Sequence, residues 1–165
     1  MLTVTLTGAD ELGARLDRAP ATVQAAVAAK SAALAAELLE LVRAKLTGGV
    51  LQSRSGALAA SAGVDGPAID GDQIVTTLFA GADLKYAEIQ EYGGVTSPHD
   101  ILPARAKALA FLMGGQQVFA RIVHHPGSRV PERSYLRSSL AEMADRIETE
   151  MKAAALDALR QQTGS

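Results

Sequence analysis

Three histidines are the residues whose chemistry could most readily support a metal site. They are His99, His124 and His125, and the chain of 165 residues contains no cysteine that could add a thiolate ligand. Adjacent residues of a β-strand point to opposite faces, so His124 and His125 are not expected to bind one ion together. The three also lack a His-Glu-x-x-His spacing. We therefore expect no metal site, and packing at a turn or a sheet edge is the favoured role.

A short segment with two tyrosines and two glutamates is the main candidate for acid–base chemistry. It contains Tyr86, Glu88, Glu91 and Tyr92, and paired carboxylates on one helix can in principle move protons. The simpler interpretation is a helix with a solvated acidic face and tyrosines that pack inward. The glycine pairs of the chain lack a P-loop lysine or a dinucleotide fingerprint, and the serines lie in no nucleophile elbow. We therefore expect no catalytic residue, no cofactor and no enzyme.

The charge balance argues against direct recognition of nucleic acid. The formal net charge is -2, whereas a DNA-binding protein normally neutralises several phosphates with clustered Lys and Arg. A local basic patch could be formed around the last loop and the following helix by Arg121, His124, Arg129, Arg133 and Arg137. Its favoured interpretation is a solvated face or the rim of a protein–protein contact, where arginine is common. It could also line a lumen that DNA crosses.

Length and composition predict one globular domain over residues 1–165. Hydrophobic residues make up 48% of the chain and charged residues 21%, which argues against disorder. Residues 1–5 lack the basic and apolar regions of a signal peptide, so we expect none. Every apolar stretch is too short to span a membrane. We expect no association with a membrane. We expect that the protein is made in a reducing cytoplasm.

Two long amphipathic helices are the clearest secondary-structure signal. Apolar residues recur at steps of three and four from residue 21 to 46 and again from Leu136 to Arg160. Thr47-Gly48-Gly49 ends the first of these helices. Shorter helices are expected at residues 10–17, 55–58 and 84–92.

The remaining segments predict a small, mostly antiparallel sheet. The segments with strand character are 2–6, 74–79, 108–113 and 117–124, the last two forming a hairpin about Gly114-Gly115. Residues 63–71 are rich in Gly and Pro and indicate turns, and residues 125–131 indicate a loop. The expected fold class is α+β, with two long amphipathic helices (N- and C-terminal) packed on a small mostly antiparallel sheet.

Four segments occur in an order that resembles a known protein family. They are Arg54-Ser55-Gly56-Ala57-Leu58, Tyr86-Ala87-Glu88-Ile89-Gln90-Glu91-Tyr92-Gly93-Gly94, the hairpin of residues 106–123, and His125-Pro126-Gly127-Ser128-Arg129-Val130-Pro131 followed by Arg133-Ser134-Tyr135-Leu136. Together they resemble the small head–tail joining, or tail-completion, proteins of long-tailed bacteriophages. The resemblance covers residues 50–140, and the flanking helices match only in kind. Residues 95–100 depart from the pattern.

The resemblance assigns a structural or assembly role to a set of motif positions. These are Gly56, Leu58, Tyr86, Glu91, Tyr92, Gly93, His125, Pro126, Gly127, Pro131, Tyr135 and Leu136. The three motif glycines suit backbone positions with positive φ or a close approach. We expect Glu91 to accept hydrogen bonds from backbone N–H groups of a neighbouring turn, and Tyr135 and Leu136 to be the first apolar anchors of the last helix.

The resemblance implies a structural virion protein of the head–tail junction, assembled in the cytoplasm of a bacterial host. Such a protein forms a cyclic homo-oligomer, for which we expect six copies, at the head-proximal end of the tail. Its other partners would be neck and tail proteins such as a head-closure protein, a tail terminator or the tail-tube protein, with DNA only as passing cargo. We expect residues 86–94 and 125–136 to lie near subunit contacts.

Three alternatives remain open from the sequence alone. The first is a tail terminator, which caps the tail tube and is also a small ring-forming protein. The second is a small metal-dependent hydrolase that uses the three histidines. The third is a DNA-binding regulator, which would bind duplex DNA in a strongly salt-dependent way.

Overall fold

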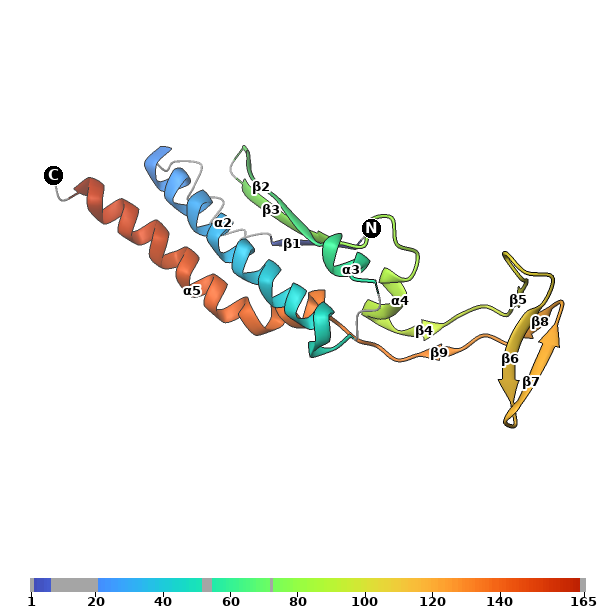
Figure 1. Ribbon diagram of the computed structural model, residues 1–165. Coiled ribbons are helices and arrows are strands. Elements are labelled where there is room, and N and C mark those ends of the chain that lie inside the picture. Colours follow the sequence, from blue (N-terminus) through green and yellow to red (C-terminus); the bar gives the residue numbers. More distant parts are fainter. Residues whose placement is uncertain (1, 7–20, 52–54, 72, 164–165) are drawn as a thin grey trace.

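The structure is an elongated mixture of helices and small antiparallel sheets (Figure 1). The computed structural model describes residues 2–6, 21–51, 55–71 and 73–163. Long helices stand near both ends of the chain, α2 (Ala21–Ala44) and α5 (Leu136–Thr163). The short helix expected at residues 10–17 lies outside the described residues.

Helix α2 ends where the sequence predicts. Its last turn widens into a π-type turn, η1 (Lys45–Gly49), in which the amides of Val50 and Leu51 both donate to the carbonyl of Lys45. Gly48 then adopts a φ of 146°, which a residue with a side chain rarely adopts. The change of direction at Gly48 separates the long helix from the following segment.

The core lies between the two long helices and beneath a three-stranded sheet. Helix α2 packs along α5 and also contacts strands β2 (Gly63–Asp70) and β3 (Gln73–Ala80). Leu38 and Val42 of α2 pack with Leu78 of β3 and Met143 of α5 in one buried cluster. Burial of each such side chain contributes roughly 1.5–3 kcal/mol.

Three ion pairs join α5 to α2 and to η1, the turn that continues α2. The side-chain nitrogen and oxygen atoms lie 3.1 Å apart in Lys30–Glu150, 2.6 Å apart in Lys45–Glu142 and 2.7 Å apart in Arg146–Glu37. Such partly exposed pairs contribute little stability. They favour the observed alignment of the two helices.

Strand β3 is the central strand of the three-stranded sheet, with β1 (Leu2–Leu6) and β2 on either side, both antiparallel to it. The prediction that residues 63–71 form turns is wrong, because most of them belong to β2. The register of β2 shifts between Asp65 and Ala68, and this irregularity accommodates Gly66 and Pro67. A bulge is one of the few places where a sheet tolerates proline.

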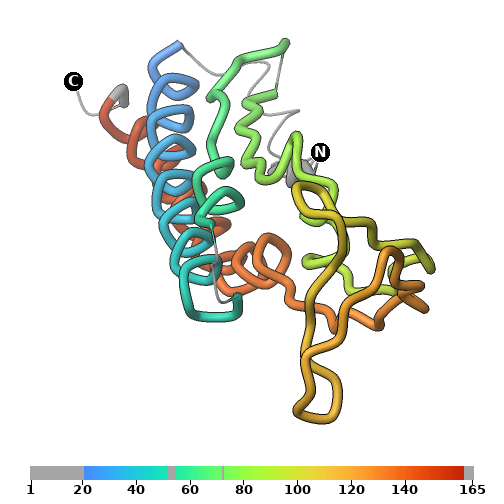
Figure 2. The backbone as a smooth tube through the Cα atoms, turned by 45° about the vertical axis from the view of Figure 1, so that its right-hand side comes forward, coloured from blue at the N-terminus to red at the C-terminus, as the bar shows by residue number. Residues whose placement is uncertain are grey.

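Residues 94–130 form an arm that projects from the helical body (Figures 1 and 2). Three antiparallel pairs follow one another along it and are nested in the sequence. They are β4 (Gly94–Val95) with β9 (Arg129–Val130), β5 (His99–Ile101) with β8 (Val123–His125), and β6 (Leu109–Met113) with β7 (Gln116–Ala120). The arm is therefore one long, interrupted β-hairpin.

The two interruptions of the arm differ in their effect on the register. Residues 96–98 separate β4 from β5, and the equally long 126–128 separates β8 from β9, so the pairing resumes in the same register. Farther out, residues 102–108 on one side face only 121–122 on the other, and the register shifts. The predicted turn at Gly114-Gly115 is confirmed, and both glycines have positive φ, as a two-residue hairpin turn requires.

The strands thus belong to several small sheets, not to the one sheet expected. The predicted strand 117–124 is divided between β7 and β8, and His125 ends β8, outside the predicted strand. The strand is divided because residues 102–108 and 121–122, which face each other between the pairs β5–β8 and β6–β7, differ in length. A change of register breaks the hydrogen-bond ladder and starts a new sheet.

Candidate functional site at the base of the arm

Helix α4 (Ala87–Tyr92) leads into the arm, and the first turn of α5 follows it on the return. Ala87 and Glu91 are four residues apart and form the buried face of α4, with Glu91 0% exposed. Tyr86 and Tyr92 are exposed, Tyr92 to 48%. The expectation of a solvated acidic face with inward tyrosines is therefore wrong for Glu91 and for both tyrosines.

The close approach of α4 to a glycine explains this orientation. A Cβ atom added at Gly81 would lie 2.2 Å from the Cβ atom of Ala87. The small side chain of Ala87 thus lets α4 lie directly on the backbone of Gly81. No space remains on that face for a tyrosine ring.

The buried carboxylate of Glu91 caps the N-terminus of α5. Oε2 accepts hydrogen bonds from the amides of Tyr135 at 2.7 Å and Leu136 at 3.0 Å. Oε1 accepts from the amide of Arg137 and from the hydroxyl of Ser134, both at 2.9 Å. The first amides of a helix have no partner inside it, and a negative charge there also complements the helix dipole. The predicted role of Glu91 is confirmed, and the turn it fixes is the start of α5.

The surroundings of Glu91 favour its charged form. Burial alone raises the pKa of this carboxyl, but hydrogen bonds from the amides of Leu136, Arg137 and Tyr135 and from Ser134 outweigh burial. The net result is a lowered pKa. At neutral pH Glu91 is therefore an anion and a structural acceptor, poorly suited to donate a proton.

Tyr135 and its neighbours lock α5 onto α4. The ring of Tyr135 is fully buried, and its hydroxyl donates to the carbonyl of Ala87 at 3.2 Å. Burial, with the charge of Glu91 as a second cause, raises the pKa of Tyr135. The amide of Arg133 donates to the carbonyl of Gln90 at 2.9 Å. Tyr135 is thus a core residue of the subunit, as the prediction of an apolar anchor requires.

Arg137 covers this junction from outside. Its Nε lies 3.3 Å from Glu91 Oε1, its Nη2 lies 2.7 Å from Glu132 Oε1, and its guanidinium carbon lies 4.4 Å from the centre of the Tyr92 ring. From the sequence, Arg137 was predicted only to belong to a local basic patch. Its role becomes recognisable only when the segments around Glu91 and Tyr135 are seen to meet.

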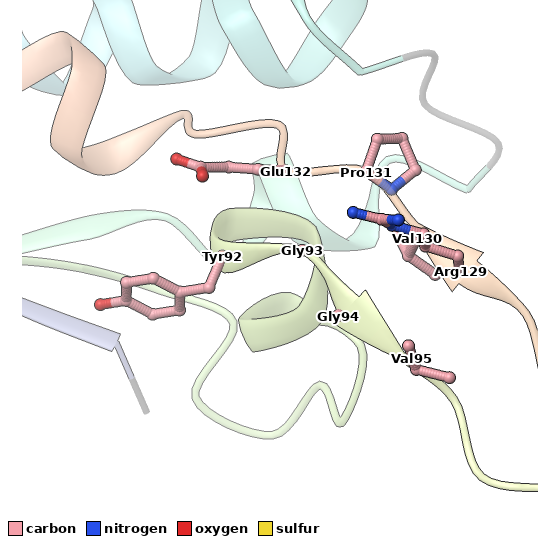
Figure 3. A pocket seen from close by; sticks show the side chains of 8 residues that line it. All are labelled: Tyr92, Gly93, Gly94, Val95, Arg129, Val130, Pro131 and Glu132. Atoms are coloured by element: carbon pink, nitrogen blue, oxygen red, sulfur yellow. The ribbon is translucent and has the colours of Figure 1, made fainter.

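A shallow hollow lies beside the junction, where β4 and β9 leave the body (Figure 3). It is lined by Tyr92, Gly93, Gly94, Val95, Arg129, Val130, Pro131 and Glu132. A Cβ atom on Gly93 would lie 2.7 Å from the amide nitrogen of Glu132, so backbone meets backbone here. Of the two charged lining residues, Arg129 and Glu132, Glu132 is paired with Arg137. The hollow thus results from the chain crossing and contains no nucleophile with an adjacent base.

The other motif positions fall into two groups. Leu58 of helix α3 (Ala57–Ala60) shares one core cluster with Ala87, Tyr135 and Leu136. Gly56 precedes α3 with a φ of 70°. Positions 125–127 lie instead on the arm. Segments one, two and four of the resemblance therefore meet at the base of the arm, and the third segment contains its tip.

Gly127 is required by the arm itself. Its φ is 89°, and a Cβ atom there would lie 2.2 Å from the carbonyl oxygen of Thr96. Its amide donates to Nδ1 of His125 at 3.1 Å. With Gly56 and Gly93, Gly127 confirms the prediction of positive φ or a close approach at the motif glycines.

The three histidines lie on paired strands of the arm. The rings of His99 and His125 stack with their centres 5.0 Å apart. His124 Nδ1 lies 2.5 Å from Asp100 Oδ1. Within the residues that the structure describes, no group of three or more His, Cys, Asp and Glu side chains is arranged to hold a metal ion. The observed contacts are those of packing on a sheet edge.

Two further findings bear on the class of protein. Among the described helices, none combines the length and the apolar composition of a membrane span. In comparisons with known proteins, no family model, no curated protein and no solved structure matches the chain.

Proposed function

We propose that this chain is a structural subunit of the neck of a long-tailed bacteriophage. In this proposal it forms a ring at the head-proximal end of the tail and helps to join the tail to the DNA-filled head. Six copies, contacts with other neck and tail proteins, and DNA as passing cargo belong to the same proposal. So does the amphipathic character of α2 and α5; in α2 the buried residues recur at helical spacing.

The position of the motif residues supports this proposal. They determine a fold junction: a buried carboxylate caps a helix, a buried tyrosine locks two helices, and glycines allow close backbone approaches. None of these contacts leaves a polar group aimed at a substrate. Residues that hold a fold junction together are expected in a family whose members share a fold and a mode of assembly.

The single observation that carries the proposal is the apolar surface of the arm. Eight of the fourteen large apolar side chains that are exposed in the described residues belong to residues 94–130. They are Val95, Ile101, Leu102, Phe111, Leu112, Met113, Phe119 and Ile122. No described residue of the arm is buried. An isolated chain with such a surface is prone to aggregation, whereas an assembly subunit covers it with neighbours.

Deletion of the gene from a phage that carries it tests this proposal. We expect lysates with DNA-filled heads and separate tails of normal length, as seen by electron microscopy, and recovery of infectivity when the gene is supplied in trans. Normal infectious particles after a clean deletion would refute the proposal. Tails of abnormal length would instead indicate the tail terminator.

Metal analysis of the purified protein tests the enzyme alternative. We expect no stoichiometric transition metal, because the three histidines make other contacts. One bound ion per chain, together with a hydrolytic activity that His124→Gln abolishes without loss of folding, would favour the hydrolase.

A further inference from the structure

The outer part of the arm carries only positive formal charge. Residues 101–130 contain four Lys and Arg and no Asp or Glu, a formal charge of +4. Three of these cations are exposed beside the hairpin β6–β7, because Arg105 and Lys107 belong to 102–108, which faces Arg121. Within the described residues, none of the three is in an ion pair. We call these three residues the basic cluster.

The hairpin β2–β3 carries only negative formal charge. Residues 63–80 contain three Asp and no Lys or Arg, a formal charge of -3. Asp65 and Asp70 are exposed on β2, which is an outer strand of its sheet. Neither of them is in an ion pair in the part of the chain that the structure describes. The hairpin is therefore an acidic surface without a cation of its own.

The two aspartates lie on one face of the sheet. Asp65 lies opposite Thr77, and Asp70 lies opposite Gln73. Directly opposite residues share a face, and so do residues four apart in a strand, so both carboxylates are on the same side. The other side of β3 faces α2, because the hydroxyl of Thr76 is hydrogen-bonded to a serine of α2 at 2.7 Å. The aspartates thus belong to the face turned away from α2.

The basic cluster and the acidic face lie apart within one copy. The arm projects from one end of the body, whereas the hairpin β2–β3 extends along the helices away from the arm (Figure 1). No ion pair joins the arm to β2 or β3 within the described residues. Surfaces of opposite sign that are separated in one copy attract each other between two copies.

We propose that the basic cluster of one copy binds the acidic face of β2–β3 in a second copy, with Arg105, Lys107 and Arg121 set against Asp65 and Asp70. The apolar hairpin β6–β7 adjoins the basic cluster, so the same contact brings it against the second copy. The opposite charges orient the two copies. Because the two surfaces differ, the contact is head-to-tail, and it generates a closed ring when the rotation between copies closes.

This inference rests on the self-association in the proposed function, and reversal of the charges tests it. The arm variant is Arg105→Glu with Arg121→Glu, and the hairpin variant is Asp65→Lys with Asp70→Lys. Each variant alone sets like charges against each other. We therefore expect its dissociation constant of self-association, measured by sedimentation, to rise on the order of tenfold or more. All four positions are exposed, so the melting temperature should stay that of the wild type.

An equal mixture of the two variants should restore association. The reversed arm of one variant then meets the reversed hairpin of the other, and the two unchanged surfaces meet in the same way. The variants alternate along the assembly, which can close into a ring when the number of copies is even, as in the proposed six. Only a contact between these two surfaces on different copies produces this recovery.

Asp83→Lys with Asp145→Lys is the matched control for the hairpin variant. Both aspartates are exposed, neither is in an ion pair within the described residues, and the change in formal charge is the same. We expect this control to associate as the wild type does and to leave the arm variant unassociated in a mixture. Recovery with the control equal to that with the hairpin variant would show an effect of net charge alone and overturn the inference.

Other results would also overturn it. They are a wild-type protein that sediments as a monomer at every concentration tested, unchanged association of both reversed variants, and a mixture that does not recover. Salt-dependent binding of duplex DNA by a monomeric wild-type protein, lost in the arm variant, would instead assign the basic cluster to nucleic acid.

The phage deletion and the charge reversal can fail independently. Association restored in the mixture without a neck defect would leave the contact in place and refute the proposed function. A neck defect, with reversed variants that associate as the wild type does, would support the function and refute this contact.

Discussion

Replacement of Glu91 by glutamine tests whether one buried carboxylate holds the arm junction together. Glutamine has nearly the same shape but no charge, and it can present only one acceptor oxygen. The side chain of Glu91 is 0% exposed and receives three backbone amides and one hydroxyl. Water cannot replace the lost acceptor in such a place.

The size of the effect follows from the donors that lose their partner. If the amide group of glutamine takes the place of Oε1, the amide and Nε of Arg137 face an NH2 group, whereas the hydroxyl of Ser134 can turn and accept. A hydrogen bond to a charged group contributes about 1.5–3 kcal/mol. We therefore expect the free energy of unfolding to fall by about 3 kcal/mol. For a domain of this size the melting temperature should fall by about 6–12 °C.

Chemical denaturation at several pH values is the appropriate assay. The lowered pKa of Glu91 means that its contribution is fully present above the ordinary value of 4.5 and is lost as the pH falls through the folded-state value. Glutamine does not titrate. The difference in unfolding free energy between wild type and Glu91→Gln should therefore be constant near neutral pH and shrink at pH values below 4.5.

Glu88→Gln on the same helix is the matched control. Glu88 is exposed, and exposed substitutions of this kind usually change stability by less than about 0.5 kcal/mol. Equal denaturation midpoints for Glu91→Gln and Glu88→Gln would refute the capping argument. A difference that persists unchanged at strongly acidic pH would refute its electrostatic part.

Two further predictions concern the tyrosine lock and the arm. Tyr135→Phe should lower the free energy of unfolding by about 1 kcal/mol, because the carbonyl of Ala87 loses its donor, and thermal denaturation of the body measures this. Gly127→Ala should increase amide hydrogen exchange along the arm, because its Cβ would collide with the carbonyl of Thr96. Gly114→Ala, whose Cβ would meet open space, should increase exchange less. Equal exchange in the two glycine variants would contradict the steric argument.

The elements with strong local signals could be predicted from the sequence. Helical spacing over more than 20 residues marks α2 and α5, and Gly114-Gly115 marks the hairpin turn, because in each case short-range geometry decides the structure. Strand β2 was not predicted, because its structure is decided by pairing with another strand and not by short-range geometry. Gly66 and Pro67 are normally turn residues, and only the pairing with β3 turns them into a bulge.

The junction at the arm base could be predicted only in part. The glycines and the acceptor role of Glu91 followed from residue type, since few residues fit those positions. The outward tyrosines did not follow, because the hydrophobicity of a six-residue helix says little about which face is buried. The available signal was the spacing of Ala87 and Glu91, which places both residues on one face of α4, the buried face. A small residue and a charged residue do not form an apolar pattern that would mark that face as buried. The role of Arg137 depends on segments more than 40 residues apart in the chain.

The matched three-residue gaps in the arm constrain how its length can vary. A residue deleted from 96–98 alone would shift the register of everything beyond it and turn side chains to the opposite face. Only equal changes on both sides, two residues at a time, would preserve pairing and facing together. Beyond β5 the unequal segments 102–108 and 121–122 carry no such restriction. The length of the inner arm can thus change only in paired steps of two residues, whereas register sets no such step for the outer part.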